Sequence, residues 1–311
     1  MERTFADPQT VEFKPAFVER YTKLTDFDVF KKYSLTYLRK SIRVNTLKIP
    51  VDELLERLKG LVTLEPIPWC PEGFWVKGQR RDFGNMLEHL IGYFYIQEAA
   101  SMIPPMVLAP KEDEMILDMC SAPGSKTTQI AQYLKNTGLV IANDVTADRL
   151  KSLGFNLQRM GVTNTVITMM PGRLFNGFEF DRILVDAPCS GIGTIRKSYK
   201  TIAMWNPDMV RRLSSTQKQL ACTAFDNLKS GGTMVYSTCT TEPEENEGVI
   251  SHILEKYEGA KVEKISLDIK RSPPVMEFNG KEFNPEVKNC LRIWPQDNDT
   301  EGFFVTRIRK E

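Results

Sequence analysis

Short, continuous apolar runs alternate with amphipathic segments in the C-terminal two thirds of the chain. The runs predict strands at residues 115–120, 139–145, 165–170, 182–188 and 233–239. The segments between them predict helices at 125–135, at 207–228 before Gly231 and Gly232, and at 243–257. A further helix is expected after the second strand and ends near Gly161. Such a pattern is typical of an α/β protein with a mostly parallel sheet covered on both faces. Residues 291–294 and 303–308 alternate as an antiparallel edge pair would.

The first 105 or so residues follow a different pattern. Residues 43–49 predict a strand, 51–61 a helix, and 73–78 and 90–97 two further strands. In the helix, one face is expected to carry Leu54, Leu55, Leu58 and Leu61. Prolines 104, 105 and 110 mark a boundary. We therefore expect a small α+β domain over 1–108 and an α/β domain over 109–311.

Composition narrows the classes of protein that remain. The net charge is +1, so any nucleic-acid contact must come from a local basic patch. No uncharged apolar run reaches the roughly 18–20 residues of a membrane span, and the first ten residues lack a secretory pattern. The six cysteines stand singly and there are two histidines, which argues against a structural metal site. We expect a cytoplasmic protein with reduced thiols, and a monomer.

The sequence DMCSAPGSKTT, residues 118–128, ends one strand and opens a helix. It lacks the Walker A pattern, and its single glycine, Gly124, disfavours a dinucleotide site. A nucleoside bound without a pyrophosphate, as in S-adenosylmethionine, needs fewer glycines, although a tight turn without a ligand is also possible. Asp144 ends the next strand, 20 residues after Gly124. It is placed either to accept the ribose hydroxyls or to cap the following helix, for which Thr146 is also available.

Two cysteines follow strand ends. Cys189 comes three residues after Asp186, and Cys239 closes the fifth strand. The first and fourth strands of such a sheet are usually neighbours, so both sulfurs are expected to face the ligand crevice. For Cys70, Cys222 and Cys290 we expect structural burial.

A thiol suits methyl transfer to a pyrimidine. Carbon-5 becomes nucleophilic when a thiolate adds to carbon-6, and a nearby cation or helix N-terminus favours that thiolate. Lys126 could supply the charge and Asp186 could hold ring nitrogen N3. The plainer alternatives are a solvated lysine and a helix cap. The residues alone do not choose between the two thiols.

The motifs DMCSAPGSKT, DAPCSG and YSTCTTEPEENE, in this order, resemble those of the Sun/NOL-type RNA 5-cytosine methyltransferases. The resemblance runs from about Gly92 to the C-terminus, and more loosely from Arg43. It implies a Rossmann-like S-adenosylmethionine methyltransferase sheet behind an N-terminal domain similar to an RNA-recognition fold. It implies methylation of carbon-5 of cytosine in RNA, with tRNA expected and rRNA as the alternative.

The same resemblance assigns roles to residues. Cys239 attacks, Cys189 helps to release the product, and Asp186 and Lys126 lie at the target base. The implied S-adenosylmethionine site comprises Cys120, Ser121, Ala122, Pro123, Gly124, Ser125, Lys126, Asp144, Arg149 and Asp186.

Two stretches leave questions open. Enzymes of the family that the chain resembles often carry, after the third strand, an acid that binds the adenine amino group. Here that place holds residues 170–173, Met-Pro-Gly-Arg. The acidic run 244–247 invites a catalytic interpretation, but Thr241 with Glu244 fits a capping box at a helix start, which we favour.

Two basic segments could contact RNA. Residues 31–48 carry six Lys or Arg side chains and no acid, with Tyr33 and Tyr37 among them, although a solvated helix face fits equally well. The second segment lies closer to Cys189 and is the better candidate: Arg196, Lys197, Lys200, Arg211 and Arg212, with Trp205. The target cytosine must be flipped out or already unpaired.

Two other classes of function stay in view. A small-molecule methyltransferase on the same fold would show no RNA affinity. An RNA-binding assembly factor without catalysis would bind RNA but transfer no methyl group, and the presence of both thiols argues against it.

Overall fold

The computed structural model describes residues 11–77 and 82–311. The first ten residues, on which the expectation of no secretory signal depends, lie outside this range. The larger sheet has the order β10-β14-β9-β8-β5-β6-β7, and β13 also pairs with β14. Its parallel strands are β5 (Met115–Asp118), β6 (Leu139–Asp144), β7 (Thr165–Met169), β8 (Phe180–Asp186) and β9 (Leu228–Thr238). Its antiparallel strands are β10 (Ala260–Glu263), β13 (Leu291–Ile293) and β14 (Phe303–Lys310).

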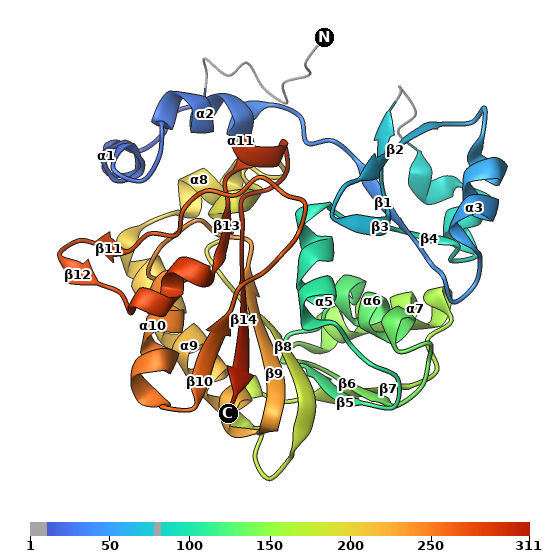
Figure 1. Cartoon of the computed structure of the whole chain (residues 1–311). Coiled ribbons are helices and arrows are strands. Elements are labelled where there is room, and N and C mark those ends of the chain that lie inside the picture. The colour runs from blue at the N-terminus through green and yellow to red at the C-terminus, as the bar shows by residue number, and fades with distance from the viewer. Residues whose placement is uncertain (1–10, 78–81) are drawn as a thin grey trace.

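Helices cover both faces of this sheet (Figure 1). On one face lie α5 (Ile103–Leu108), α6 (Ser125–Tyr133) and α7 (Ala147–Met160), and on the other α9 (Pro207–Asp226) and α10 (Glu247–Lys256). Successive strand residues point to opposite faces. Ile116 accordingly packs in the cluster that contains Ile130 of α6. Leu117 packs with Leu220 of α9. The predicted α/β class and Rossmann-like sheet are confirmed.

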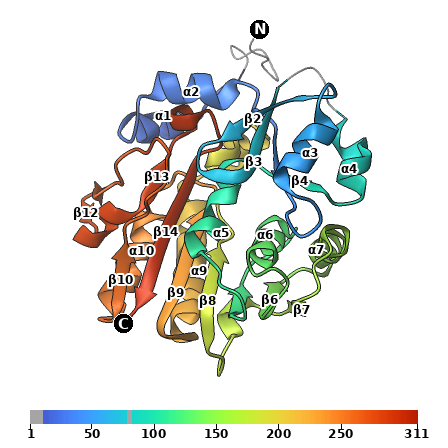
Figure 2. The same cartoon turned by 45° about the vertical axis from the view of Figure 1, so that its right-hand side comes forward.

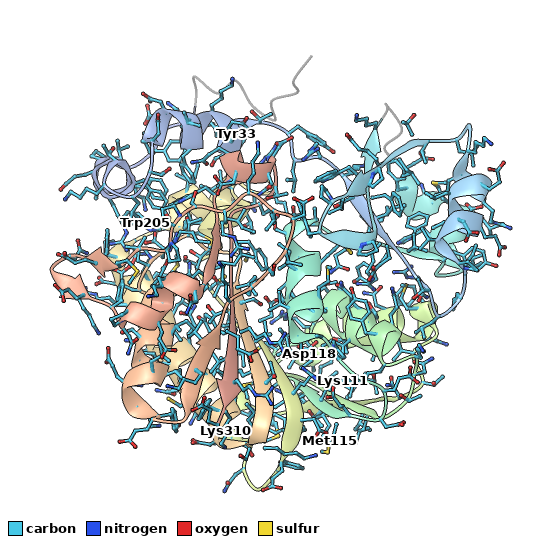
Figure 3. All side chains as sticks on the ribbon, viewed as in Figure 1. Tyr33, Lys111, Met115, Asp118, Trp205 and Lys310 are labelled. Atoms are coloured by element: carbon cyan, nitrogen blue, oxygen red, sulfur yellow. The ribbon has the colours of Figure 1, made fainter. Side chains whose placement is uncertain are left out.

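The chain order reverses at β5, which lies between β8 and β6. The sequence predicts that the first and fourth strands are neighbours, and the pairing of β5 with β8 confirms this prediction. Figure 3 shows Asp118 at the end of β5 nearest the middle of the molecule, with Met115 at the strand's opposite end. The carboxyl ends of the parallel strands therefore meet at one edge, where ligands bind in open α/β sheets.

A second, antiparallel sheet has the order β2-β3-β1-β4. Its strands are β1 (Ser41–Val44), β2 (Thr63–Ile67), β3 (Cys70–Lys77) and β4 (Phe94–Ile96), accompanied by α3 (Val51–Leu58) and α4 (Leu87–Leu90). Leu54 and Leu58 are buried against this sheet, as predicted. Leu61 was wrongly placed on the same face, because α3 ends at Leu58 and Leu61 is exposed.

The first two helices do not pack against this small sheet. The aromatic side chains of α1 (Pro15–Thr22) and α2 (Phe27–Leu35) pack with Trp205 and Trp294 of the larger unit. In Figure 2 both helices lie beside β13 and away from α3. Helices α1 and α2 therefore pack apart from the small sheet with which the domain prediction groups them. The boundary after residue 108 stays a prediction, and α5, which it assigns to the first domain, packs on the larger sheet.

Several predicted bounds differ because tertiary pairing decides them. Helix α9 ends at Asp226, and Gly231 and Gly232 lie inside β9. Strand β14 is internal, since β10 pairs with its outer edge, so 303–308 was wrongly expected at the edge. Strand β1 ends at Val44. The strand predicted over 90–97 is shorter, because Leu90 ends α4 and β4 covers Phe94–Ile96. The remaining short elements are α8 (Lys200–Met204), α11 (Pro295–Asn298), β11 (Glu277–Phe278) and β12 (Lys281–Glu282).

The described residues contain neither a membrane-spanning helix nor a metal-binding cluster. None of their helices combines the length and apolar character needed to cross a bilayer. Within the same ranges, no three His, Cys, Asp or Glu side chains gather as a metal site would require.

A buried ion pair joins β13 to the start of α10. The Arg292 guanidinium donates to both carboxylate oxygens of Glu247, at 2.7 and 2.5 Å, and to the Thr241 carbonyl at 2.9 Å. The side chains of Arg292 and Glu247 are 1% and 0% exposed. Removal of one partner would leave the other charge buried without compensation, which is far more costly than loss of an exposed pair.

We predict that Arg292→Met lowers the free energy of unfolding by about 3–5 kcal/mol. Urea unfolding followed by circular dichroism measures this loss. The double variant Arg292→Met/Glu247→Gln should recover part of it, because the uncompensated charge is gone. Lys151→Met removes an exposed pair with Asp148 and should cost less than about 1 kcal/mol. Equal losses in Arg292→Met and Lys151→Met would contradict the prediction.

Candidate active site

A cavity of about 440 Å³ opens at the carboxyl edge of the larger sheet. Loops that follow β5, β6, β7, β8 and β9 line it, together with one side of α9. The predicted site residues among its walls are Cys120, Ala122, Asp144, Arg149, Asp186, Cys189 and Cys239. The structure therefore brings residues from four separate motifs to one hollow.

The sulfurs of Cys189 and Cys239 lie 3.3 Å apart, close enough for one thiol to donate a hydrogen bond to the other. Both are free and partly exposed, whereas Cys70, Cys222 and Cys290 are buried. Strands β8 and β9 are paired in parallel with Asp186 opposite Ser237. The segments that leave these strands consequently start side by side, which explains how residues 50 positions apart come into contact.

Lys126, which is buried, and Asp186, which is partly exposed, form an ion pair beside the sulfurs. Lys126 Nζ donates to Asp186 Oδ2 at 2.8 Å, and Ser237 Oγ donates to Asp186 Oδ1 at 2.7 Å. Burial acts to lower the pKa of Lys126, but the charge of Asp186, with a smaller contribution from Cys239, leaves that pKa raised. Lys126 is thus a buried cation and not a solvated lysine, and Asp186 does not cap a helix.

A second cation, Lys197, approaches Cys239 from the loop after β8. Its ammonium lies 2.6 Å from Glu301 Oε1. Although the Lys197 side chain is 53% exposed, desolvation of its ammonium acts to lower the pKa, but the charges of Glu301 and Glu98, and to a lesser extent Cys239, leave that pKa raised. Burial and Glu98 raise the pKa of Glu301 to about 7, against the effect of Lys197.

Cys189 has the opposite surroundings. The pKa of Cys189 is raised well above its usual value, first by the hydrogen bond with Cys239, then by burial, and then by the charges of Cys239 and Glu245. Cys189 therefore retains a proton under conditions in which an ordinary thiol would begin to lose it. The two sulfurs share one contact but differ in the charges around them.

The loop of residues 118–128 is built as a close cradle. Gly124 adopts φ of 102° directly before α6, a conformation that favours glycine. Asp144 is 2% exposed, and its carboxylate accepts hydrogen bonds from the amides of Val145 at 2.8 Å and Ala122 at 3.3 Å. Arg149 lies 3.2 Å from Asp144 and donates to the Ala122 carbonyl at 2.7 Å. The end of β6 and the loop after β5 are thus tied together.

The segment after β7 contributes backbone where related sites often carry an acid. Met170 donates its amide to Asn143 Oδ1 at 3.1 Å, and Pro171, Gly172 and Arg173 line the cavity. Asp144 and Asp186 are the acids among the described residues of the cavity wall.

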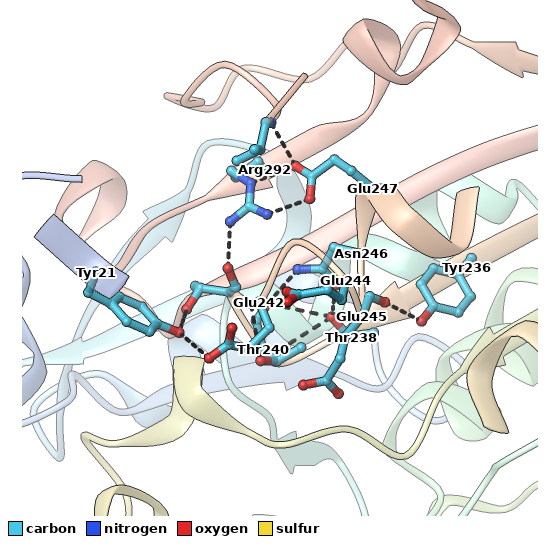
Figure 4. Close-up of polar contacts among 12 residues, drawn as sticks. Tyr21, Tyr236, Thr238, Thr240, Glu242, Glu244, Glu245, Asn246, Glu247 and Arg292 are labelled. Atoms are coloured by element: carbon cyan, nitrogen blue, oxygen red, sulfur yellow. Dashed lines mark hydrogen bonds and ion pairs between the residues drawn. The ribbon is translucent and has the colours of Figure 1, made fainter. Parts of the chain in front are cut away.

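In the acidic run after β9, Glu245 and Glu247 are buried and Glu244 is partly exposed, and the run is not a helix cap (Figure 4). Helix α10 begins at Glu247, four residues later than predicted, and no side chain caps it. The expected capping box is wrong, because Thr241 contacts the Tyr21 hydroxyl and Glu244 pairs with Arg20. Asn246, directly before α10, accepts a hydrogen bond from Thr238 Oγ1 at 2.6 Å and donates to the Thr240 carbonyl at 2.9 Å, so the start of the helix lies beside the segment that carries Cys239.

Both predicted basic segments need correction. Arg43 is fully buried and donates to Gln97 and to Thr128 Oγ1, the latter at 2.9 Å. Arg196 is buried under the 299–300 loop, and the Trp205 indole donates to Glu242 at 2.6 Å. These three side chains stabilise the fold and are not available to RNA. Lys32, Lys197, Lys200, Arg211 and Arg212 are exposed.

Sequence reasoning missed four ionisable side chains near the cavity. Asp118 is fully buried, accepts from Thr127 Oγ1 at 2.7 Å and keeps Oδ1 without a hydrogen-bond partner. An acid that closes a buried strand was a signal that could have identified it. Glu245 stood in an acidic run that was assigned to capping. Lys197 was noted only as an RNA contact, and Glu301, distant in sequence, gave no signal.

A mostly parallel sheet of this order, with a nucleoside-sized cavity at its carboxyl edge, defines the S-adenosylmethionine-dependent methyltransferase class. A family model for "16S rRNA methyltransferase RsmB/F" matches residues 105–309, and one for the "N-terminal domain of 16S rRNA methyltransferase RsmF" matches 13–99. The chain belongs to the RsmB/F family, which corresponds to the Sun/NOL-type family resembled by its motifs.

Its relatives include enzymes that act on two kinds of RNA. The tRNA (cytosine(49)-C(5))-methyltransferase of Pyrococcus abyssi is 48% identical over 94% of this chain and 95% of its own length. Ribosomal RNA small subunit methyltransferase F of Erwinia tasmaniensis is 43% identical over 96% of this chain and 64% of its own length. The chain thus spans under two thirds of that relative.

Solved structures agree with the fold. A methyltransferase homologue from Pyrococcus horikoshii is 35% identical, with a TM-score of 0.81 over 96% of this chain and 100% of its own. NSun6 from Pyrococcus horikoshii with SFG is 26% identical, with a TM-score of 0.84 over 96% of this chain and 99% of its own.

We predict that Asp118→Asn becomes more stabilising, relative to the unsubstituted protein, as pH rises from 5 to 8. Burial raises the pKa of Asp118 to about 7, so the folded state binds more protons than the unfolded state below that pH. The folded protein consequently loses stability as the carboxyl ionises, and asparagine removes this loss. The relative gain should be about 2–3 kcal/mol.

Urea unfolding at several pH values measures this gain. Asp148→Asn is the control, since Asp148 is exposed and its side chain pairs with Lys151 at the surface. A constant difference between Asp118→Asn and the unsubstituted protein across this pH range would contradict the prediction.

Proposed function

We propose that this protein methylates carbon-5 of cytosine in tRNA through a covalent bond between Cys239 and carbon-6. The single observation that carries the proposal is the 3.3 Å contact between the Cys189 and Cys239 sulfurs at the mouth of the cavity. Two thiols in contact suit a reaction in which one forms a covalent bond to the base and the other manages a proton.

The cavity fits S-adenosylmethionine. Its volume of about 440 Å³ lies within the range of small-molecule sites. The ribose would lie at Asp144, whose carboxylate is fixed by backbone amides and by Arg149. The residues expected to hold the remainder are those of the 120–126 loop, with Asp186. The related NSun6 structure with SFG, an analogue of S-adenosylmethionine, supports this assignment. When bound, S-adenosylmethionine supplies an electrophilic methyl group on a sulfonium.

The charges around the sulfurs support Cys239 as the nucleophile. Lys126 and Lys197 interact electrostatically with Cys239, whereas Glu245 is the carboxylate that contributes at Cys189. A thiolate is stabilised by cations, so the negative charge belongs on Cys239 and the shared proton on Cys189. Addition of Cys239 to carbon-6 moves an electron pair towards carbon-5, which then bonds to the methyl group. Asp186, held by Lys126, would orient the N3 edge of the ring by accepting a hydrogen bond from the exocyclic amino group beside N3.

The contact between the Cys189 and Cys239 sulfurs also accounts for release of the methylated base. Once Cys239 is bonded to carbon-6 it has no negative charge, and the first cause that keeps the proton on Cys189 is removed. Cys189 can then lose its proton to solvent and take the proton from carbon-5. The electrons of that C–H bond restore the ring double bond, the bond between sulfur and carbon-6 breaks, and Cys239 leaves as a thiolate beside a protonated Cys189. One proton is released per methyl transferred.

The choice of tRNA over rRNA rests on sequence identity. The tRNA (cytosine(49)-C(5))-methyltransferase of Pyrococcus abyssi is 48% identical to this chain, and the rRNA methyltransferase of Erwinia tasmaniensis is 43% identical. RNA would approach over the exposed cations that follow Cys189 and the small N-terminal sheet, with the cytosine flipped out. We infer a cytoplasmic location from this substrate.

We predict that the protein releases tritium from tRNA labelled at carbon-5 of cytosine when S-adenosylmethionine is present. Cys239→Ala should lose turnover by more than about 10³-fold, because no covalent addition can occur. Cys189→Ala should form the covalent adduct and fail to release it, which a denaturing gel with labelled RNA would show.

Two controls make this experiment decisive. Cys222→Ala changes a buried cysteine of α9 and should leave tritium release unchanged within about threefold. An active, folded protein that releases no tritium from tRNA, but does so from 16S rRNA, would favour the rRNA alternative. Adduct accumulation in Cys239→Ala would reverse the two roles.

We predict that Asp144→Asn weakens S-adenosylmethionine binding by about 10–100-fold, because an amide accepts hydrogen bonds from ribose hydroxyls less strongly than a carboxylate. Isothermal titration calorimetry on the RNA-free protein measures the effect. Asp148 is exposed in the first turn of α7, which follows β6. The Asp148→Asn protein should therefore bind S-adenosylmethionine as the unsubstituted protein does. Unchanged affinity in Asp144→Asn would contradict the assigned site.

A further inference from the structure

Glu245 is a buried carboxylate that contacts the turn carrying Cys189. Its side chain is 0% exposed, and Oε2 accepts hydrogen bonds from the Ser190 amide at 2.9 Å and from Gln217 Nε2 at 2.8 Å. The same Gln217 nitrogen donates to the Pro188 carbonyl at 2.9 Å. The residues on both sides of Cys189 are thus connected to one carboxylate, either directly or through α9.

Glu245 itself is anchored by its backbone. The Tyr236 hydroxyl, from β9, donates to the Glu245 carbonyl at 2.6 Å (Figure 4). Because β9 also leads into Cys239, this bond fixes the loop of Glu245 relative to the second sulfur. The carboxylate therefore spans the loops of both cysteines.

The groups that face this carboxylate do not neutralise it. Cys189 and Ser190 face it from the loop after β8, Gln217 from α9, Tyr236 from β9 and Glu242 from its own loop. None of these five residues is a cation. Oε1 has no hydrogen-bond partner among the described residues. Burial raises the pKa of Glu245 to about 7, although hydrogen bonds from Ser190 and Gln217 oppose this effect.

We propose that Glu245 is a positioning residue for the two thiols: it holds the turn of residues 188–190 against Cys239, and its negative charge keeps the shared proton on Cys189. Lys126 and Lys197 act in the same sense from the other side, since a cation near Cys239 and an anion near Cys189 favour the same proton position. The inference rests on the proposed function and adds the group that separates the roles of two chemically identical side chains.

The proposal can be tested on the full-length protein without RNA. Iodoacetamide reacts with thiolates, and mass spectrometry reports the alkylation rate of each cysteine separately. In the unsubstituted protein Cys239 should react faster than Cys189, with the ratio of the two rates increasing as pH rises through about 7, the pKa of Glu245. In Glu245→Gln the ratio should fall about tenfold at pH 8, equivalent to one pKa unit, and lose this pH dependence.

Glutamine preserves the oxygen that accepts from Ser190 and Gln217, so the turn should keep its position. The thermal midpoint of the Glu245→Gln protein should equal or exceed that of the unsubstituted protein above pH 7, since a buried charge is removed. Glu244→Gln is the matched control: Glu244 is the adjacent acid, pairs with Arg20 and is 30% exposed. Its alkylation ratio should be unchanged. An unchanged ratio and pH profile in Glu245→Gln would overturn the proposal.

A second variant keeps the test open if Glu245→Gln fails to fold. Gln217→Met removes a hydrogen bond that lowers the pKa of Glu245, so the inflection in the alkylation ratio should move to higher pH. An inflection that stays in place would count against the role of Glu245.

RNA separates this inference from the proposed function. With labelled tRNA, the covalent adduct of Glu245→Gln should persist at least about fivefold longer than in the unsubstituted protein, because the Cys189 thiolate is a weaker base for the carbon-5 proton without the nearby negative charge. If tritium is released normally while alkylation and adduct lifetime are unchanged, the positioning role fails and the methyl transfer stands. If alkylation follows the prediction but no RNA is methylated, the proposed function fails instead.

Discussion

The arrangement of the site depends on the pairing of buried carboxylates in the loop after β9. Glu242 meets Arg20, Tyr21 and the Trp205 indole; Glu245 meets Ser190 and Gln217; Glu247 meets Arg292. All three side chains are 0% exposed. A buried charge without a partner is strongly destabilising, so this loop can close only when α1, α9 and β13 are in place. The position of Cys239 is thereby coupled to elements from the whole length of the chain.

The same constraint explains how two cysteines in contact acquire different surroundings. The parallel pairing of β8 with β9 brings their ends together, but it treats both sulfurs alike. Their difference comes from charge: Lys126 and Lys197 act on Cys239, and Glu245 acts on Cys189. Enzymes commonly separate the acid and base roles of similar groups through their surroundings. Here the separating charges come from α6, from the loop after β8 and from the loop after β9.

The N-terminal sheet is joined to the loop of residues 118–128 by another buried cation. Arg43 of β1 donates to Gln97, to the Ser125 carbonyl at 2.8 Å and to Thr128 Oγ1 at 2.9 Å. Ser125 and Thr128 belong to the first turn of α6, directly after the loop that lines the cavity. Burial lowers the pKa of Arg43, which indicates the cost of placing this charge between the two units. The bonds it donates offset that cost and fix the small sheet beside the cavity.

The sequence by itself determined the class of fold, because continuous apolar strands separated by amphipathic helices leave few other arrangements. It also determined that Cys189 and Cys239 would follow strand ends, since each closes an apolar run next to small or polar residues. The tertiary structure decided what local pattern cannot encode. Arg43, Arg196 and Trp205 look like an RNA-binding surface in one dimension, yet they are buried against partners that lie 37 to 104 residues away. Glu245 looks like a residue of a helix start, yet its role arises from Ser190 and Gln217, which reach it only after β8, α9 and β9 have packed together.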